Sequence, residues 1–260
     1  MFTNQVKREL QAGNVQIGTW ITQIDAPSLP WILAEAGFDY VNIDMEHSCF
    51  SISSVANLCA NALQAGLTPI VRPPANQPHL LSRPLDNGAM GIHLPHVDTS
   101  AAAEAAVAAM RFPPDGNRGQ HTPTVTTGYT RGNAGRYMPH YNDQVLLIVQ
   151  IESATAVANL DGILSVPGVN GAVVGRGDLA ADLGVPGQLD HPKVLEAVDL
   201  VLDGCLQRGL FPNTAVLDVA DAQHWIERGV LMLTYGNETQ LLHEAGLAAV
   251  QGVGLSRSAS

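Results

Sequence analysis

The chain has 260 residues, a formal net charge of −11 at neutral pH and a sequence pI near 5.1. Apolar residues make up 46% of it and charged residues only 14%, which is typical of a compact globular protein and excludes intrinsic disorder. The negative charge disfavours binding to nucleic acid or to an anionic membrane, because both need a positive field. A small molecule is therefore the expected partner.

The chain shows no sign of secretion or of membrane insertion. Its first thirteen residues predict a short amphipathic helix that ends at Gly13, with none of the features of a secretory signal. No apolar run approaches the roughly 18 residues needed to span a bilayer. Cys49, Cys59 and Cys205 are too few for a disulfide framework and have no metal-binding spacing, so they are interpreted as reduced thiols. These features predict a cytoplasmic protein.

Eight short runs rich in Val, Ile and Leu are predicted to be strands, and they alternate with segments whose apolar residues recur every three or four positions. The predicted strands are 15–21, 40–44, 68–72, 90–94, 145–151, 170–175, 210–216 and 230–236, and clear helical segments are 28–37, 100–110 and 191–209. Several helical segments stop at glycine, which suits a left-handed residue just past a helix end: Gly37, Gly66, Gly88, Gly209 and Gly229.

Eight strand–helix pairs in about 250 residues predict a (β/α)8 barrel, the TIM barrel of the α/β class. A doubly wound open sheet is the alternative, but no glycine-rich phosphate-binding motif follows the first strand. We expect one domain over residues 1–260, with a flexible tail at 255–260. The connection 111–144 is unusually long and holds Arg111, Arg118, Arg131 and Arg136 with His121 and His140, so it is expected either to be functional or to contain short elements.

In such a barrel the C-terminal ends of the strands meet at one rim, where the chemistry is found. The residues expected at this rim are Asp44, Glu46, His47, Arg72, Gln150, Glu152, Asp178, Asn213, Thr214, Tyr235 and Asn237. Glu152 and Asp178 would repel each other unless a cation lay between them, and oxygen ligands favour Mg²⁺, Mn²⁺ or Co²⁺ over Zn²⁺. The alternative is that each carboxylate pairs with an arginine.

His47 and Asp44 have the parts of a base and its orienting carboxylate, although a structural histidine is the alternative. Arg72 is suited to stabilise charge on a substrate oxygen, or else pairs with Asp86. The glycine turn in "VGRGDLAADLG", from Val174, offers backbone N–H groups to a carboxylate, beside Asp178.

His93 and His96, in "HLPH", have a spacing that suits a metal, but the proline between them favours structural or loop roles. The three tryptophans are interpreted as core or interface residues: Trp20, Trp31 and Trp225.

Several stretches resemble the HpcH/HpaI family, the class II pyruvate aldolases. These are "FDYVNIDMEHS", "VRPPAN", "LDNGAMGIHLPHV", "RFPPDGNRG", "VQIESATAVANLDGIL" and "VNGAVVGRGDLAADLG", and the similarity runs from about Gly13 to about Ala248. The resemblance implies that Glu152 and Asp178 bind the metal beside Gln150, and that His47, oriented by Asp44, handles protons. It also implies that Arg72 contacts the keto or enolate oxygen and that the amides of Gly177 and Asp178 receive the pyruvate carboxylate. Glu46 and Asp86 are expected in supporting positions.

Two departures from the family pattern concern the aldehyde half of the site. In the turn "GRGDLA", Arg176 stands where the family commonly has proline and Gly177 where it commonly has alanine, and Arg176 is expected either to bind an anionic group or to face a neighbouring subunit. After the eighth strand the frequent "GxD" appears as "GNE", with Asn237 and Glu238. The resemblance also implies a hexamer, a trimer of dimers that exchange a C-terminal helix, and the segment "QLLHEAGLAAVQGV" is suited to be that helix.

The resulting hypothesis is a metal-dependent lyase that cleaves a 4-hydroxy-2-oxo acid to pyruvate and an aldehyde. Two alternatives remain at this stage. One is an oxaloacetate decarboxylase or an enolate-forming synthase, and the other is a non-catalytic barrel that only binds a ligand. Neither the aldehyde nor the physiological metal follows from the sequence.

Overall fold

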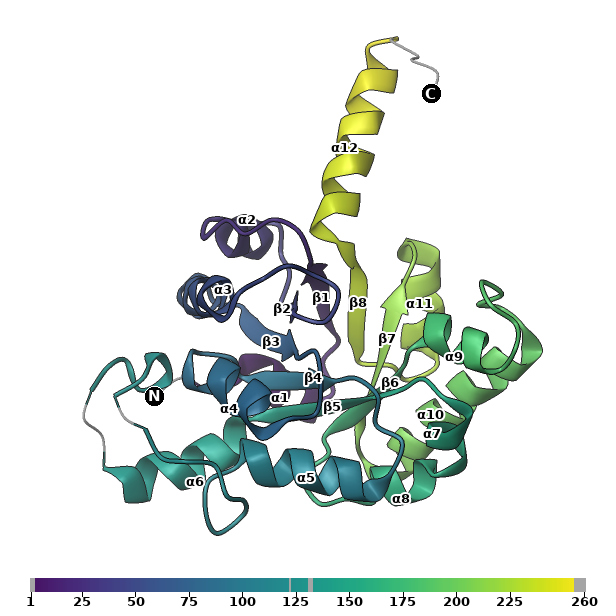
Figure 1. Ribbon diagram of the computed structural model, residues 1–260. Coiled ribbons are helices and arrows are strands. Elements are labelled where there is room, and N and C mark those ends of the chain that lie inside the picture. Colours follow the sequence, from purple (N-terminus) through teal and green to yellow (C-terminus); the bar gives the residue numbers. More distant parts are fainter. Residues whose placement is uncertain (1–2, 122, 131–132, 255–260) are drawn as a thin grey trace.

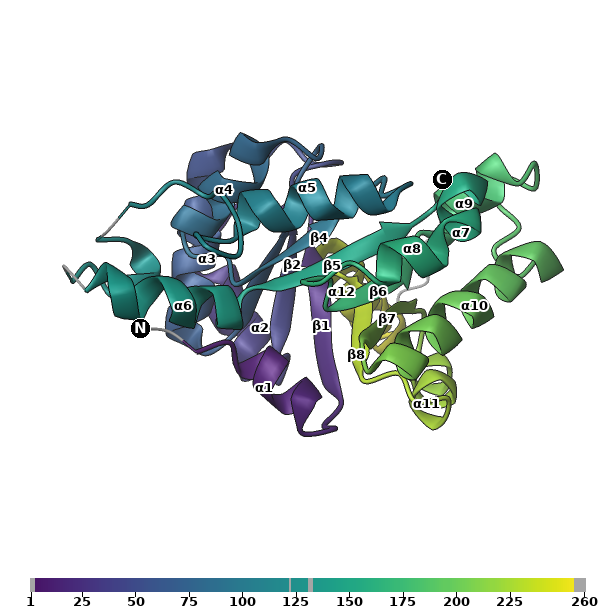
Figure 2. The ribbon, with the colours of Figure 1, turned by 90° about the horizontal axis from the view of Figure 1, so that it is seen from below.

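The computed structural model describes residues 3–121, 123–130 and 133–254, and it confirms the (β/α)8 barrel. Eight parallel strands close in chain order, with β8 beside β1, and helices surround most of the sheet (Figures 1 and 2). The strands are β1 Gln16–Ile21, β2 Tyr40–Asp44, β3 Thr68–Arg72, β4 Gly91–Leu94, β5 Leu146–Ile151, β6 Gly171–Val174, β7 Phe211–Val216 and β8 Met232–Asn237. Each lies within a residue or two of its predicted range.

The helices are α1 Gln5–Gln11, α2 Leu29–Glu35, α3 Ile52–Ala65, α4 Pro78–Asp86, α5 Ser100–Met110, α6 Ala134–Gln144, α7 Ala154–Ala158, α8 Leu160–Leu164, α9 Arg176–Asp182, α10 Pro192–Arg208, α11 Val219–Glu227 and α12 Glu238–Gly252, with a 3₁₀ turn η1 at Val125–Thr127. All five glycines predicted at helix ends have positive φ, from 66° to 110°. Their left-handed backbone costs little because glycine has no Cβ.

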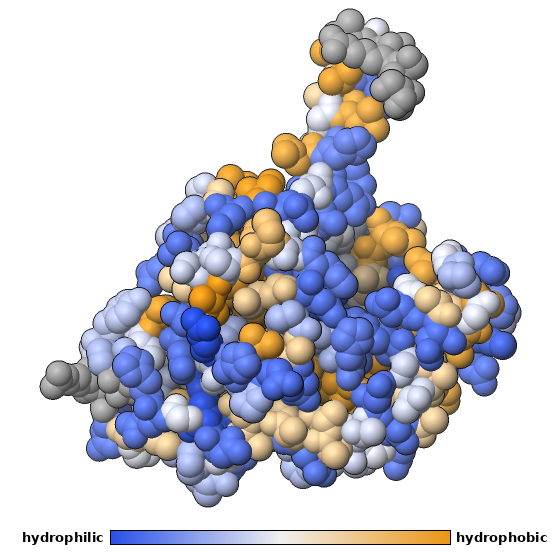
Figure 3. Space-filling model, viewed as in Figure 1, coloured by the Kyte–Doolittle hydropathy of each residue, from blue (hydrophilic) through white to orange (hydrophobic). Residues whose placement is uncertain are grey.

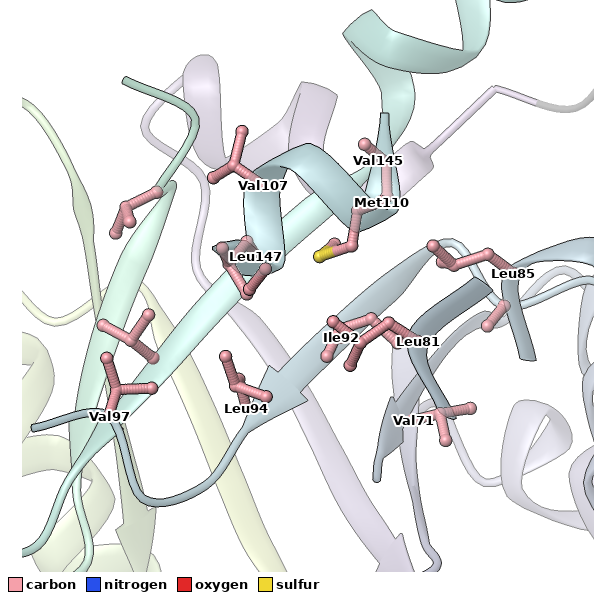
Figure 4. Packing of buried hydrophobic residues seen from close by; sticks show 14 of the residues in the cluster. Val71, Leu81, Leu85, Ile92, Leu94, Val97, Val107, Met110, Val145 and Leu147 are labelled. Carbon is pink, nitrogen blue, oxygen red and sulfur yellow. The ribbon is translucent and has the colours of Figure 1, made fainter. Parts of the chain in front are cut away.

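Helices α4 and α5 show how the outer face of the barrel is buried. Leu81 and Leu85 of α4 lie over Val71 and Ile92 of the neighbouring strands, while α5 contributes further apolar side chains over β5 (Figure 4). Each fully buried side chain of this size contributes about 1.5–3 kcal/mol through the hydrophobic effect. This packing fixes the directions in which β3, β4 and β5 deliver polar residues to the rim.

Helix α1 closes the end of the barrel at which the strands begin (Figure 2). Its Val6 and Leu10 are buried against Tyr40 and other interior residues. The Tyr40 ring crosses the interior and donates a hydrogen bond to the carbonyl of Leu233 at 2.7 Å. Gly18 makes room for it, because a Cβ there would lie 2.4 Å from the ring. These side chains therefore fill the barrel interior near the end at which the strands begin.

Helix α12 projects away from the barrel (Figure 1). Several of its apolar side chains are exposed, and they give the projecting helix hydrophobic patches (Figure 3): Leu242, Leu247 and Val250. The predicted tail at 255–260 lies outside the described residues. Within the described part, no helix is both long and apolar enough to cross a membrane. The three cysteines are free thiols, with Cys59 and Cys205 buried and Cys49 exposed.

Candidate active site

Asp44 and Arg72 form a two-bonded ion pair at the rim. They are register partners at the ends of β2 and β3. Arg72 donates from Nε to Oδ1 at 2.9 Å and from Nη2 to Oδ2 at 2.8 Å. Burial by itself raises the pKa of Asp44, but the guanidinium and the backbone N–H groups of Glu46 and His47 outweigh it, so the pKa lies below its usual value. Asp44 is therefore a carboxylate at neutral pH.

This pairing changes the role expected for Asp44. The carboxylate meets His47 through the backbone N–H at 3.4 Å, while the His47 imidazole lies nearest Glu46, with Nε2 3.6 Å from Oε2. The physical reason is the register of β2 and β3, which places a guanidinium directly beside Asp44. Asp44 thus orients Arg72, and its backbone contacts shape the turn that carries His47.

The Arg72 guanidinium contacts three side chains, those of Asp44, Glu46 and Trp20. Besides Asp44, its guanidinium lies 4.3 Å from the centre of the Trp20 ring, and its Nε is 3.3 Å from Glu46 Oε2. A cation over an indole is favourable, because the ring face carries negative potential. Trp20, interpreted from the sequence as a core or interface residue, instead lines the cavity. Arg72 therefore presents its charge in one fixed place.

Asp86 is not a neighbour of this site, so the supporting position predicted for it is wrong. Its carboxylate pairs with Arg118, whose side chain is fully buried. Helix α4 runs antiparallel to the strands, so its last residue, Asp86, lies near the start of β4 at the opposite end of the barrel. The alternative pairing of Asp86 with Arg72 is wrong for the same reason.

His96 lies in the site, although the sequence favoured a structural or loop role for it. Its ring stands between two carboxylates, with Nε2 2.9 Å from Glu46 Oε1 and Nδ1 3.0 Å from Glu152 Oε1. Its backbone N–H also donates to Glu152 Oε1 at 2.5 Å. These contacts use a left-handed backbone, with φ 56°. That conformation is uncommon outside glycine, and the "HLPH" spacing alone gave no sign of it.

A second set of contacts, made by Gln150 and His93, holds Glu152. His93 is buried and its Nε2 lies 2.7 Å from Gln150 Oε1. Gln150 Nε2 in turn donates to Glu152 Oε2. Burial is the main reason that the pKa of His93 falls to about 3, so its imidazole is neutral. Gln150 and Glu152 are thus part of one buried network.

Gly175, at the end of β6, lets α9 approach this network. A Cβ at Gly175 would lie 2.7 Å from Glu152 Oε2 and 3.0 Å from Gln150 Nε2. Asp178 is in the first turn of α9, and Gly177 beside it has open space where a Cβ would be. An alanine, common in the family at that position, would therefore fit.

The pair Glu152 and Asp178 fits a hard divalent ion. Burial raises the pKa of Glu152, against hydrogen bonds from Gln150 and His96, and the negative charge of Asp178 adds a smaller effect in the same direction. A bound cation would reverse that effect, and oxygen ligands suit Mg²⁺ or Mn²⁺. Among the described residues, no group of three or more His, Cys, Asp or Glu side chains is already arranged around one ion position.

One cavity of about 440 Å³ opens at the rim. The residues that line it are Trp20, Thr22, His47, Arg72, His93, Gln150, Val173, Val174, Gly175, Arg176, Gly177, Asp178, Leu189, Ala215, Leu217 and Asn237. His47 enters it with a side chain that is 64% exposed. Of the other rim candidates, Asn213 and Thr214 are buried, and Asn213 bonds Thr234 within the barrel. Of the predicted site residues, His47, Arg72, Gln150, Gly177 and Asp178 line the cavity, whereas Asp44, Glu46 and Glu152 do not.

Two of the residues that depart from the family pattern line the cavity, and a third, Glu238, supports a neighbouring loop. Arg176 and Asn237 line the cavity, and Arg176 Nη2 donates to the carbonyl of Ala215 at 2.9 Å. Glu238 is buried, and its Oε1 accepts the backbone N–H groups of residues 22, 23 and 24. Glu238 therefore supports the loop after β1 and does not face the cavity.

The long connection 111–144 does not reach the cavity with any described residue. Arg118 is buried elsewhere, between the rings of Phe112 and Tyr141 at 4.6 and 4.5 Å. The segment contains η1 and α6, and it packs beside α4 and α5 (Figure 1). Arg131 falls outside the described residues. The connection therefore contains short elements, and its described arginines do not line the cavity.

The chain is similar to known proteins over nearly its whole length. The HpcH/HpaI aldolase/citrate lyase family model matches residues 16–245. A 4-hydroxy-2-oxo-heptane-1,7-dioate aldolase of Salmonella typhimurium is 33% identical over 261 residues, 99% of this chain and 97% of that one. An HpcH/HpaI aldolase structure from Desulfitobacterium hafniense superposes with TM-score 0.92 at 30% identity, covering 99% of both chains. The citrate synthase SbnG does so with TM-score 0.84 at 27% identity, covering 97% of this chain and 100% of that one.

The chain belongs to the HpcH/HpaI aldolase/citrate lyase family, and it is a carbon–carbon lyase of the aldolase type. The family resemblance read from the sequence is thereby confirmed. The similarity to a citrate synthase leaves the particular reaction to be argued from the cavity.

Proposed function

We propose that the enzyme is a divalent-metal-dependent aldolase, which cleaves a 4-hydroxy-2-oxo acid to pyruvate and an aldehyde and catalyses the reverse addition. The observation that carries this proposal is one cavity lined by His47, Arg72 and Asp178, with Glu152 buried behind the lining residue Gln150. Glu152 and Asp178 would hold the ion, Mg²⁺, Mn²⁺ or Co²⁺, which would act as a Lewis acid on the 2-keto group.

The protein's own groups have separate tasks in this proposal. The His47 imidazole accepts the proton of the 4-hydroxyl group as the bond between C3 and C4 breaks. Arg72 offers its fixed positive charge to the oxygen that becomes negative in the pyruvate enolate. The backbone N–H groups of Gly177 and Asp178, in the first turn of α9, receive the pyruvate carboxylate. Protonation of the enolate then gives pyruvate.

The lysines support a mechanism without a Schiff base. The chain contains only Lys7 and Lys193, and neither lines the cavity. Lys7 lies in α1 at the closed end of the barrel and donates to the carbonyl of Asp143. Electrophilic activation of the keto group therefore has no amine available at the site, which favours an ion held by carboxylates.

Hydrogen exchange of pyruvate tests this proposal. The protein in D₂O with Mn²⁺ or Mg²⁺ is expected to exchange the pyruvate methyl hydrogens, followed by proton NMR, because the site forms an enolate. EDTA should stop the exchange, and added Mn²⁺ should restore it. Absence of exchange with every ion would contradict both the aldolase and the alternative, an oxaloacetate decarboxylase or enolate-forming synthase.

We further propose that the aldehyde carries a negatively charged group. Arg72 and Arg176 are the arginines that line the cavity, and Arg72 is already paired with Asp44. Among the described residues Arg176 has no acidic partner, and its recorded hydrogen bond is to a carbonyl. Cleavage of a 4-hydroxy-2-oxo-heptane-1,7-dioate, the compound in the name of the Salmonella relative, would give such an aldehyde, succinic semialdehyde.

Replacement Arg176→Gln is expected to lower kcat/KM for addition of pyruvate to succinic semialdehyde by about 10–100-fold, because a hydrogen bond to a charged group contributes about 1.5–3 kcal/mol. The rate with butanal, which has the same chain length without the carboxylate, should change less than about threefold. Arg83→Gln, at an exposed position on α4, is the control. Equal losses with both aldehydes would remove Arg176 from acceptor recognition.

The assembly predicted from the family resemblance remains a proposal. The exposed apolar side chains of α12, including Leu242 and Val250, support a helix that packs against another subunit. A hexamer with exchanged α12 helices would bury them.

A further inference from the structure

His93 is a buried polar residue to which the proposed mechanism gives no task. It lies on β4 and is 3% exposed. Its ring packs against Trp20, with centroids 5.1 Å apart. The hydrogen-bond partner of its Nε2 is the Gln150 side chain at 2.7 Å. Burying an apolar side chain at position 93 would cost less desolvation free energy than burying an imidazole. A specific role is therefore expected for the His93 imidazole.

Glu152 and His93 together fix the Gln150 amide, because the carboxylate only accepts and so requires the amide Nε2, which leaves Oε1 to face His93. A neutral imidazole donates from one nitrogen only, and an amide oxygen only accepts. Because the atom facing His93 is Gln150 Oε1, the donor is His93 Nε2–H. The other end of the amide, Nε2, then donates to Glu152 Oε2. With the amide reversed, its oxygen would face a carboxylate oxygen and no hydrogen would lie between them.

Glu152 is consequently held at both oxygens. Oε1 accepts the backbone N–H of His96 and lies 3.0 Å from the ring Nδ1 of the same residue. Oε2 accepts Gln150 Nε2. Each carboxylate oxygen has about two acceptor positions, so the Gln150 contact leaves Oε2 with one position free. The Gln150 contact therefore determines where the free position of Oε2 points.

We propose that His93 is a positioning residue, which fixes the Gln150 amide so that Glu152 is held in the orientation that binds the divalent ion. The inference rests on the proposed function for the role of Glu152. It adds a residue that lies outside the set holding the ion and acts through the chain His93, Gln150, Glu152. Outer hydrogen-bond partners of this kind typically change metal affinity by 10–100-fold when they are removed.

Two substitutions at position 93 separate hydrogen bonding from packing. His93→Phe keeps a ring against Trp20 but removes the donor. His93→Gln removes the ring but places an N–H group at about the reach of the imidazole Nε2. Mn²⁺ affinity, measured by titration calorimetry without substrate, is expected to fall about 10–100-fold in His93→Phe and to stay within about threefold of the original protein in His93→Gln. Thermal unfolding without metal shows whether each variant is folded.

A third variant keeps the test decisive if His93→Phe does not fold. Gln150→Met breaks the same chain at its next link, and it should weaken Mn²⁺ binding to the same degree. Combined with His93→Phe it should cause little additional loss, because both changes remove one connection.

The outcomes that overturn the proposal are distinct from a failure of the proposed function. Unchanged Mn²⁺ affinity in His93→Phe or in Gln150→Met would remove the positioning role. A loss in His93→Gln equal to that in His93→Phe would assign His93 to packing against Trp20. If the original protein bound no Mn²⁺, the metal-dependent mechanism itself would be contradicted, and this inference would fall with it.

Discussion

Replacement His47→Ala is expected to lower kcat/KM for cleavage of a 4-hydroxy-2-oxo acid by about 10²–10⁴-fold, the usual contribution of a positioned acid–base group. Oxaloacetate decarboxylation should fall by less than about tenfold, since loss of CO₂ requires no deprotonation of a hydroxyl group. Steady-state rates with both substrates, at the same Mn²⁺ concentration, measure the difference. The side chain is 64% exposed, so its removal should leave the fold intact.

His79→Ala provides the matched control, because His79 is an exposed histidine on α4 and does not line the cavity. It should leave both reactions unchanged. Parallel losses of cleavage and decarboxylation in His47→Ala would show that His47 serves the shared enolate chemistry and is not the base for the hydroxyl group. A chain that decarboxylates oxaloacetate far faster than it cleaves any hydroxy-oxo acid would instead favour the decarboxylase alternative.

Replacement Arg118→Met is expected to lower the free energy of unfolding by about 3–5 kcal/mol, the usual effect of breaking a buried ion pair. The change removes the bond to Asp86 and the cation between the Phe112 and Tyr141 rings. Arg118 also joins the segment 111–144 to α4, so its loss should expose that segment to protease. Urea unfolding at constant protein concentration measures the difference.

Arg208→Met is the control for Arg118→Met. Arg208 pairs with Asp161, whose side chain is 88% exposed, and exposed pairs contribute about 0–1 kcal/mol. The folded Arg118→Met protein should keep its kcat, because Arg118 does not line the cavity. A small loss of stability together with a large loss of kcat would contradict the structural role assigned to this arginine.

The strands were predictable because their signals are local. In a run such as "YVNID" the apolar Val41 and Ile43 alternate with other residues and all five are buried, and glycine at positions such as 37 and 66 marks the end of a helix. Parallel order then places every strand end at one rim. The residues Asp44, His47, Arg72, Glu152 and Asp178 were therefore expected together before the geometry was known.

The partners of the rim residues were not predictable in the same way. Whether Arg72 pairs with Asp44 or Asp86 depends on register and on the direction of α4, which no local pattern records. His96 reaches two carboxylates only through a left-handed backbone, and a proline before it obscured the signal. The task of His93 depends on a contact 57 residues away in the chain. Long-range hydrogen bonds of this kind require the structure.

The carboxylate of Glu238 connects the projecting helix to the wall of the cavity. Glu238 is the first residue of α12, and its carboxylate accepts hydrogen bonds from the backbone N–H groups of residues 22, 23 and 24. Thr22 and Asn237, the residue before Glu238, line the cavity. These hydrogen bonds therefore connect α12 to the part of the cavity wall formed by Thr22 and Asn237. The position of α12 and the shape of the cavity wall are thus joined by one buried side chain.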